Sequence, residues 1–212
     1  MMKPVMPLKL EYMYLLTYIM ILKLISSRTG LQTTLPATTC VCPGFVRDNS
    51  SKDVPGQAVT PPSVYDGEQR YIILTIQKDE NTGDWSLYRE DDSGNRERIG
   101  FWPKTLFTSL ATSGAKVEWG GTVFFTEDDK QDVASPPMGS GHFPVEGEGK
   151  AASFKNVKLF DENGRIYSKP VDVRRLITAD DCYLVSEFQM EEAMDHGNGY
   201  MFYYGGPGGC GF

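Results

Sequence analysis

Histidine and positive charge are both scarce in this chain of 212 residues. The two histidines, His142 and His196, lie in no ligand-spaced motif. The pair Cys40 and Cys42 is also closer together than the cysteine pairs of structural zinc sites, so we expect no metal and no cofactor. The net charge is −7, and because the first 28 residues carry +3, the remainder carries −10. A body this acidic would repel a phosphate backbone, which excludes nucleic acid as an expected partner.

A long hydrophobic run is also lacking. The apolar run from Tyr12 to Leu22 is too short to span a bilayer comfortably, and it lies between two lysines and Lys23. This pattern is typical of a secretory signal peptide, which we place at residues 1–28, and it predicts a secreted protein. The alternatives are a membrane anchor through residues 12–25, with Lys23 reaching the interface, and a buried strand or helix. Against the buried element, the run has no polar alternation and no caps.

Two further features agree with export. Asn49 begins the sequence Asn-Ser-Ser, which is an acceptor for N-glycosylation in exported proteins. The four cysteines form an even set, and in an exported protein disulfides are the default expectation. The cysteines are Cys40, Cys42, Cys182 and Cys210.

Patterns for long helices are the third absence, because 22 glycines and 13 prolines favour turns. Residues 29–62 are rich in Thr, Pro, Ser and Gly, which indicates loops with one short strand around residues 44–46. One helix is expected over residues 103–113, between Pro103 and Gly114. Runs of β-branched and aromatic residues predict strands at 70–77, 85–88, 98–102, 117–125, 152–160, 164–173, 182–188 and 200–204, the first three as a meander. We therefore predict an all-β antiparallel sandwich with one short helix, as a single domain over residues 63–212.

The expected strand at residues 117–125 contains the adjacent glycines Gly120 and Gly121. Alternation along a strand turns Trp119 toward the core, whereas Gly120 and Thr122 face the other way. Gly120 would then leave bare backbone on the outer face, where a ligand can approach closely. A β-bulge at the glycine pair explains the same pattern equally well.

Seven segments, taken together, resemble the plant neprosin family from about Cys40 to the C-terminus. They are CPGF (42–45), GDWSLY (83–88), GFWPKTLF (100–107), WGG (119–121), SPPMGSGHF (135–143), GKAASFKN (149–156) and YGGPGG (204–209). The resemblance implies a secreted β-sandwich with a cleft on a concave sheet. In its characterised members it implies a proline-directed endopeptidase of the glutamic class, in which two glutamates activate water and protonate the leaving amine. A proline-containing peptide is the partner that follows.

In the family pattern, the second glutamate directly follows the Trp-Gly-Gly segment, and Thr122 occupies that position here. A threonine hydroxyl without a base beside it is too weakly acidic to activate water. Glu118 lies on the same face of the expected strand, but four residues span roughly 13 Å, so we do not expect it to substitute. The resemblance places the first glutamate upstream of the cysteine pair, in a part that this chain replaces with its leader and a loop. The sandwich is therefore expected to be incomplete through N-terminal truncation.

The sequence thus predicts a secreted neprosin-like domain that is catalytically impaired. An active endopeptidase and a non-catalytic cell-wall or peptide-binding module are the alternatives. The resemblance and the leader together imply a disulfide between Cys182 and Cys210, whereas a bridge between Cys40 and Cys42 would be strained. The residues expected to line the cleft are Trp119, Gly120, Gly121, Thr122, Met138 and His142.

Overall fold

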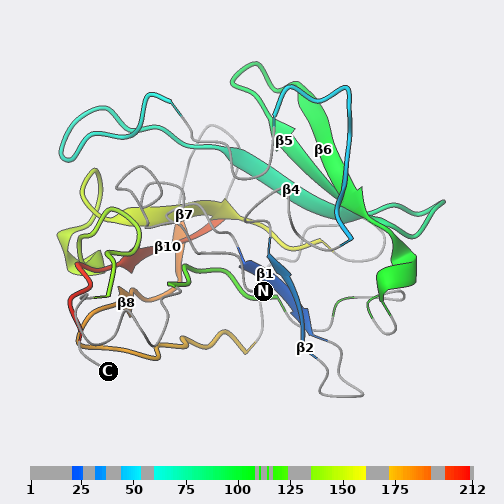
Figure 1. The fold of residues 1–212 in the computed structure, drawn as a ribbon. Helices are drawn as coiled ribbons and strands as arrows, with labels where there is room; N and C mark the ends of the chain where they lie inside the picture. Colours follow the sequence, from blue (N-terminus) through cyan, green and yellow to red (C-terminus); the bar gives the residue numbers. More distant parts are fainter. Residues whose placement is uncertain are drawn as a thin grey trace, which may run out of the picture. The chain divides into compact units, whose positions relative to one another are not determined.

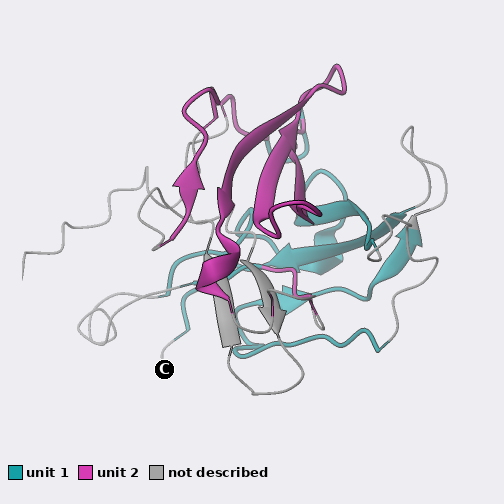
Figure 2. Ribbon diagram, turned by 90° about the vertical axis from the view of Figure 1, so that its right-hand side faces the viewer, with its two compact units in different colours: residues 1–17, 64–68, 121–212 teal, residues 18–63, 69–120 magenta. Residues whose placement is uncertain are grey.

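The computed structural model describes residues 44–53, 60–107, 110, 114, 117–123, 135–160, 172–190 and 199–210, together with the backbone of residues 21–25, 32–36 and 191. The chain divides into two compact units, which are coloured separately in Figure 2. Among the described residues, unit 1 contains residues 64–68 and those from 121 onward. Unit 2 contains residues 21–63 and 69–120. The border between Gly120 and Gly121 therefore falls inside the Trp-Gly-Gly segment.

Unit 2 is built on a four-stranded antiparallel sheet in the order β3-β6-β5-β4 (Figure 1). Its strands are β3 (Val46–Arg47), β4 (Ile73–Lys78), β5 (Trp85–Glu90) and β6 (Arg96–Trp102). A turn at residues 79–84 connects β4 to β5, and a turn at residues 91–95 connects β5 to β6. Asp79 and Asp91 stabilise these turns by accepting backbone hydrogen bonds within them. The predicted meander is therefore confirmed, and a short strand lies near residues 44–46 as expected.

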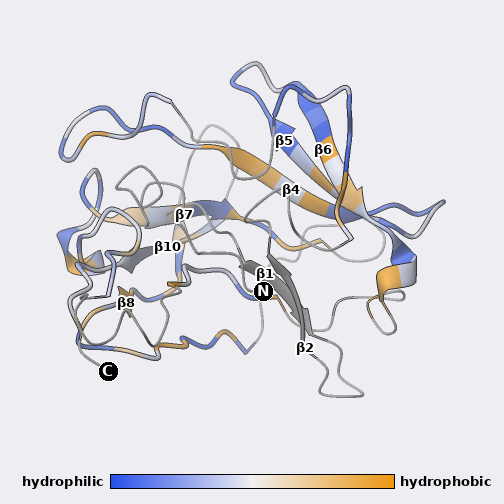
Figure 3. Cartoon of the chain, viewed as in Figure 1, coloured by the Kyte–Doolittle hydropathy of each residue, from blue (hydrophilic) through white to orange (hydrophobic). Residues whose placement is uncertain are grey.

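One face of this sheet carries the core of unit 2. Its buried members are Leu87, Ile99, Trp102, Phe107 and Leu110, and Phe45, Leu74, Ile76, Trp85 and Val117 pack against them. Phe45 meets Trp102 edge to face with ring centroids 4.7 Å apart. The indole N–H of Trp85 donates to the Leu110 carbonyl at 3.0 Å, which satisfies its polar atom beside the core. Figure 3 shows the apolar start of β4 in orange and the charged start of β6 in blue.

The helix predicted over residues 103–113 is wrong as a single helix. Among the described residues of this range, only Lys104–Leu106 are helical, as one 3₁₀ turn after Pro103. Phe107 has an extended backbone, with φ −118° and ψ 143°, and its side chain is buried in the core together with Leu110. The gain from burying these two apolar side chains outweighs the weak local preference for helix, so the chain leaves the helix after one turn.

The strand predicted over residues 117–125 is also wrong where it can be checked, since none of residues 117–123 belongs to a strand. Residues 124–125 lie outside the described residues. All seven residues from Val117 to Val123 are half-buried, so the alternation that would turn Trp119 inward and Thr122 outward is not observed. Strand geometry depends on a paired neighbour, which the local sequence cannot supply.

Unit 1 contains a second four-stranded antiparallel sheet, in which β7 (Ala152–Val157) and β8 (Leu184–Val185) flank β10 (Gly199–Gly205), and β9 (Gln189–Glu191) also pairs with β10. Phe202 and Tyr204 of β10 lie against Phe154 of β7, with centroids 5.0 and 5.1 Å apart. These pairs form a row of aromatic rings along the sheet. The predicted strands at 152–160 and 200–204 are confirmed as β7 and β10, whereas that at 182–188 shortens to β8. Most of the strand expected at 164–173 lies outside the described residues, and Asp172 and Val173 are not in a strand.

An additional strand pair lies near the N-terminus, where β1 (Ile21–Ile25) pairs antiparallel with β2 (Gln32–Pro36). It extends across the boundary expected between the leader and the loop-rich segment, and the sequence did not indicate it. Among the described residues, the structure contains no helix with the length and apolarity to cross a bilayer. The fold is all-β with antiparallel sheets and very little helix, as predicted.

Candidate functional site

The two glycines of the Trp-Gly-Gly segment have different surroundings. A Cβ added to Gly120 would meet no described atom within 4 Å, so its backbone is open on that side. A Cβ added to Gly121 would lie only 2.7 Å from the sulfur of Met138 and 3.0 Å from the ring of Tyr204. A side chain at position 121 would clash with Met138 and Tyr204, which pack directly on this backbone, so the position requires glycine. Thr122 follows at once and is half-buried.

Met138 itself is held by the C-terminal glycine-rich segment. The backbone groups of Met138 and Gly206 exchange two hydrogen bonds, of 2.9 and 3.1 Å. Gly139 follows with φ +67°, and a Cβ there would lie 2.9 Å from the Cβ of Ala152, so the turn requires glycine for two independent reasons. These contacts pack the segment at residues 138–143 against the glycine-rich segment at residues 204–209, although the two are far apart in the sequence.

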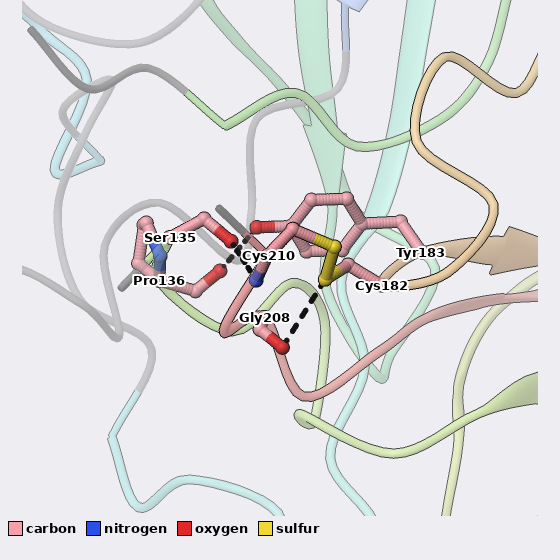
Figure 4. Close-up of a disulfide and its surroundings, with 6 residues drawn as sticks. All are labelled: Ser135, Pro136, Cys182, Tyr183, Gly208 and Cys210. Atoms are coloured by element: carbon pink, nitrogen blue, oxygen red, sulfur yellow. Dashed lines mark hydrogen bonds between the residues drawn. A yellow bond between two sulfur atoms is a disulfide. The ribbon is translucent and has the colours of Figure 1, made fainter. Parts of the chain in front are cut away.

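A disulfide joins Cys182 to Cys210, as predicted (Figure 4). Their Cα atoms are 5.9 Å apart, and the bridge links positions separated by 28 residues. Around it, the Tyr183 hydroxyl donates to the Pro136 carbonyl at 2.6 Å. The Cys210 N–H donates to the hydroxyl of the buried Ser135 at 3.2 Å. The disulfide thus fastens the chain after β10 to the residues just before β8, and the two hydrogen bonds join these to the segment that leads into Met138.

His142 belongs to a cluster that the sequence did not reveal. Its Nδ1 lies 3.0 Å from Oε1 of Glu146, four residues later in the chain. The Tyr65 hydroxyl donates to Oε2 of the same carboxylate at 3.0 Å, and the Tyr65 ring lies 4.3 Å from the His142 ring, centroid to centroid. The spacing of His142 and Glu146 was visible in the sequence, but no local pattern links either residue to Tyr65.

The electrostatics of this cluster favour the ionised carboxylate of Glu146. Desolvation tends to raise its pKa, but the hydrogen bonds from Tyr65 and His142 outweigh desolvation, and the net pKa is lowered. The same bond to Glu146 raises the pKa of Tyr65. Glu148 has a lowered pKa as well, chiefly through the Lys155 ammonium at 2.7 Å and also through the Tyr203 hydroxyl at 3.0 Å. Both glutamates are therefore held in the basic form, as acceptors.

Of the six residues expected to line a cleft, the structure brings Gly121, Thr122, Met138 and His142 into unit 1, with Gly121 against Met138. Trp119 and Gly120 belong to unit 2, as does Glu118, and they are half-buried. That these residues line a cleft, and that Glu118 does not substitute for a glutamate at position 122, stay predictions.

Two other predictions have no structural test: the strain in a bridge between Cys40 and Cys42, and the absence of a metal. Cys40 and Cys42 lie outside the described residues. Among the residues that are described, no group of three or more His, Cys, Asp or Glu side chains is arranged to hold a metal ion.

Asn49 lies at an exposed turn, and Ser51, the hydroxyl residue of its acceptor sequence, is only 4 % exposed. The Ser51 hydroxyl is engaged with the backbone of Asp53 in the folded chain. We expect a glycan on Asn49 in exported protein, added before folding buries Ser51, and seen as a mobility shift that an endoglycosidase removes. Asn49→Gln and Ser51→Ala should abolish the shift, whereas Ser50→Ala should retain it. A chain that is exported without the shift would contradict this prediction.

A comparison of the sequence with known protein families gives a match that covers these segments. The family model described as Neprosin matches residues 27–207 of the chain. The match includes the Trp-Gly-Gly segment, the Met138 turn, Cys182 and most of the glycine-rich C-terminal segment. The chain therefore belongs to the neprosin family.

Proposed function

We propose that this chain is a secreted neprosin-family domain in which catalysis by a pair of glutamates is lost or severely impaired. The observation that carries the proposal is Thr122, which stands directly after the Trp-Gly-Gly segment where the family resemblance implies a glutamate. Water activation needs a base and departure of the amine needs an acid, and a hydroxyl without a neighbouring base supplies neither.

The charge state of two carboxylates in unit 1 supports the proposal. A general acid must remain protonated at the working pH, which requires a raised carboxyl pKa. In unit 1, Glu146 and Glu148 have lowered pKa values and are engaged as hydrogen-bond acceptors. Neither is poised to donate a proton to a leaving amine.

The secreted location is part of the same proposal. A disulfide between Cys182 and Cys210 is compatible with an oxidising, extracellular route. The leader at residues 1–28 and the acceptor sequence at Asn49 agree with that route, and a membrane anchor through residues 12–25 is the alternative.

A peptide-binding module without catalysis is the second candidate, and the open backbone at Gly120 favours it. A strand backbone or loop that carries no side chain lets a peptide approach closely. The ligand of such a module is a proline-containing peptide, as the family resemblance implies.

A cleavage and binding assay tests both candidates. Exported protein is incubated with a proline-containing fluorogenic peptide at about pH 3 to 5, a range set by ordinary carboxyl pKa values. We expect no turnover above that of the Glu118→Gln variant. Saturable binding of the uncleaved peptide would assign the module function. Clear turnover that Glu118→Gln abolishes would overturn the proposal and make Glu118 catalytic.

A further inference from the structure

The segment Val64–Glu68, here called the strap, belongs to unit 1, although the residues before and after it belong to unit 2. Two hydrogen bonds within the strap shape it as a turn, from the Val64 N–H to the Glu68 carbonyl at 2.9 Å and from the Gly67 N–H to the Val64 carbonyl at 3.0 Å. The strap is exposed along its whole length, with Val64 at 57 % and Tyr65 at 51 %. Apolar burial therefore contributes little to its placement, and polar contacts must hold it.

Those polar contacts converge on the segment from His142 to Lys150. The Tyr65 hydroxyl donates to Glu146 at 3.0 Å, and the Tyr65 ring lies against the ring of His142. The Asp66 N–H donates to the Gly149 carbonyl at 2.9 Å. The Lys150 ammonium lies 5.9 Å from the Tyr65 ring centroid, at the outer limit of a cation–π contact.

We propose that the strap is an acid-released cover over His142, held in place by the ionised Glu146 carboxylate and freed when that carboxyl takes up a proton. Glu146 joins the strap to His142, since it accepts from Tyr65 and from His142. A protonated carboxyl is a weaker acceptor than a carboxylate, so protonation weakens both bonds together. This proposal does not depend on whether the chain is a peptidase.

The other charged groups near the strap do not replace Glu146 as the switch. The His142 ring can donate from Nδ1 in both its neutral and its cationic form, so its ionisation does not break the bond. The Lys150 ammonium lies near the Tyr65 ring. Asp66 and Glu68 lie on the strap itself, and Glu148 is paired with Lys155 and Tyr203.

The sign of the pH dependence follows from the lowered pKa of Glu146. A carboxyl whose pKa is lowered by folding contributes stability that is complete above its unfolded pKa and is lost as the pH falls through the folded pKa. The strap is therefore closed at neutral and mildly acidic pH. It opens only at a pH below the ordinary glutamate value of 4.5.

Residue-resolved amide hydrogen exchange on the full chain tests the proposal. The reporter is the Asp66 N–H, which bonds across to Gly149, and the reference is the Gly67 N–H, which bonds within the strap. After correction for intrinsic rates, we expect Asp66 protection to be similar at pH 7 and pH 5 and lost at pH 3. Glu146→Gln should lower Asp66 protection at pH 7 by on the order of tenfold, the range for hydrogen bonds to a charged group. Tyr65→Phe should lower it less, because the ring contact remains.

Glu148→Gln is the matched control, because Glu148 also accepts from a tyrosine hydroxyl, that of Tyr203, which lies outside the strap. It should leave Asp66 protection unchanged. If Glu146→Gln and Glu148→Gln have the same effect on Asp66 at pH 7, the proposal is wrong, whether or not the whole chain unfolds at pH 3. Equal protection of Asp66 in the unmodified chain at pH 7 and pH 3 would also overturn it.

Discussion

Changing Thr122 to glutamate is expected to leave the chain without measurable cleavage after proline at about pH 3 to 5. Loss of one partner of a general acid–base pair costs typically about 10² to 10⁴-fold in rate. The substitution returns one carboxyl to the position after Gly121, but two carboxyls with separated pKa values are required. One of them must accept a proton while the other donates one.

The contacts of Glu146 and Glu148 explain why we expect neither to serve as the second carboxyl. When two carboxyls lie close together, the pKa of one of them is raised. We expect a single glutamate at position 122 to lack such a neighbour. Glu146 is bound to Tyr65 and His142, and Glu148 is bound to Lys155 and Tyr203, so both are engaged elsewhere.

The measurement is product release from a fluorogenic proline-containing peptide, with Thr122→Gln as the matched variant of equal size without a carboxyl. We expect the Glu and Gln variants to be equally inactive. Joining the upstream part of an intact family member to the Thr122→Glu chain should be the smallest change that produces turnover. Turnover by Thr122→Glu alone, absent in Thr122→Gln, would show that a second carboxyl is already in place.

The second large effect is expected from loss of the disulfide. Replacing Cys182 and Cys210 together by serine should lower the free energy of unfolding by roughly 3–4 kcal/mol, from the chain entropy released over a separation of 28 residues. Since small domains are stable by only about 5–15 kcal/mol, this loss is a large share of the total. The midpoint of urea unfolding of exported protein measures it.

Tyr183→Phe is the control for this prediction, because it removes the hydrogen bond to Pro136 beside the intact disulfide. That variant should lose only about 1 kcal/mol. Replacement of Cys40 and Cys42 by serine should have little effect if no bridge joins them. An unchanged urea midpoint after loss of Cys182 and Cys210, or free thiols at both positions in exported protein, would contradict the prediction.

The sequence by itself determined the elements whose signals are local. The meander β4-β5-β6 followed from runs of β-branched and aromatic residues separated by turns, at which Asp79 and Asp91 accept backbone hydrogen bonds. The strands β7 and β10 were predicted in the same way. The family followed from short segments such as Trp-Gly-Gly, and the disulfide followed from the family and the leader.

Only the tertiary structure decided the remainder, because it depends on partners distant in the sequence. Burial of Phe107 and Leu110 in the core ended the helix after Leu106. The need for glycine at position 121 came from Met138 and Tyr204, which pack on its backbone. The cluster of Tyr65, His142 and Glu146 joins residues up to 81 positions apart. A local pattern reports the preference of a few neighbouring residues, whereas these contacts exist only after the chain has folded back on itself, and their energies then outweigh local preference.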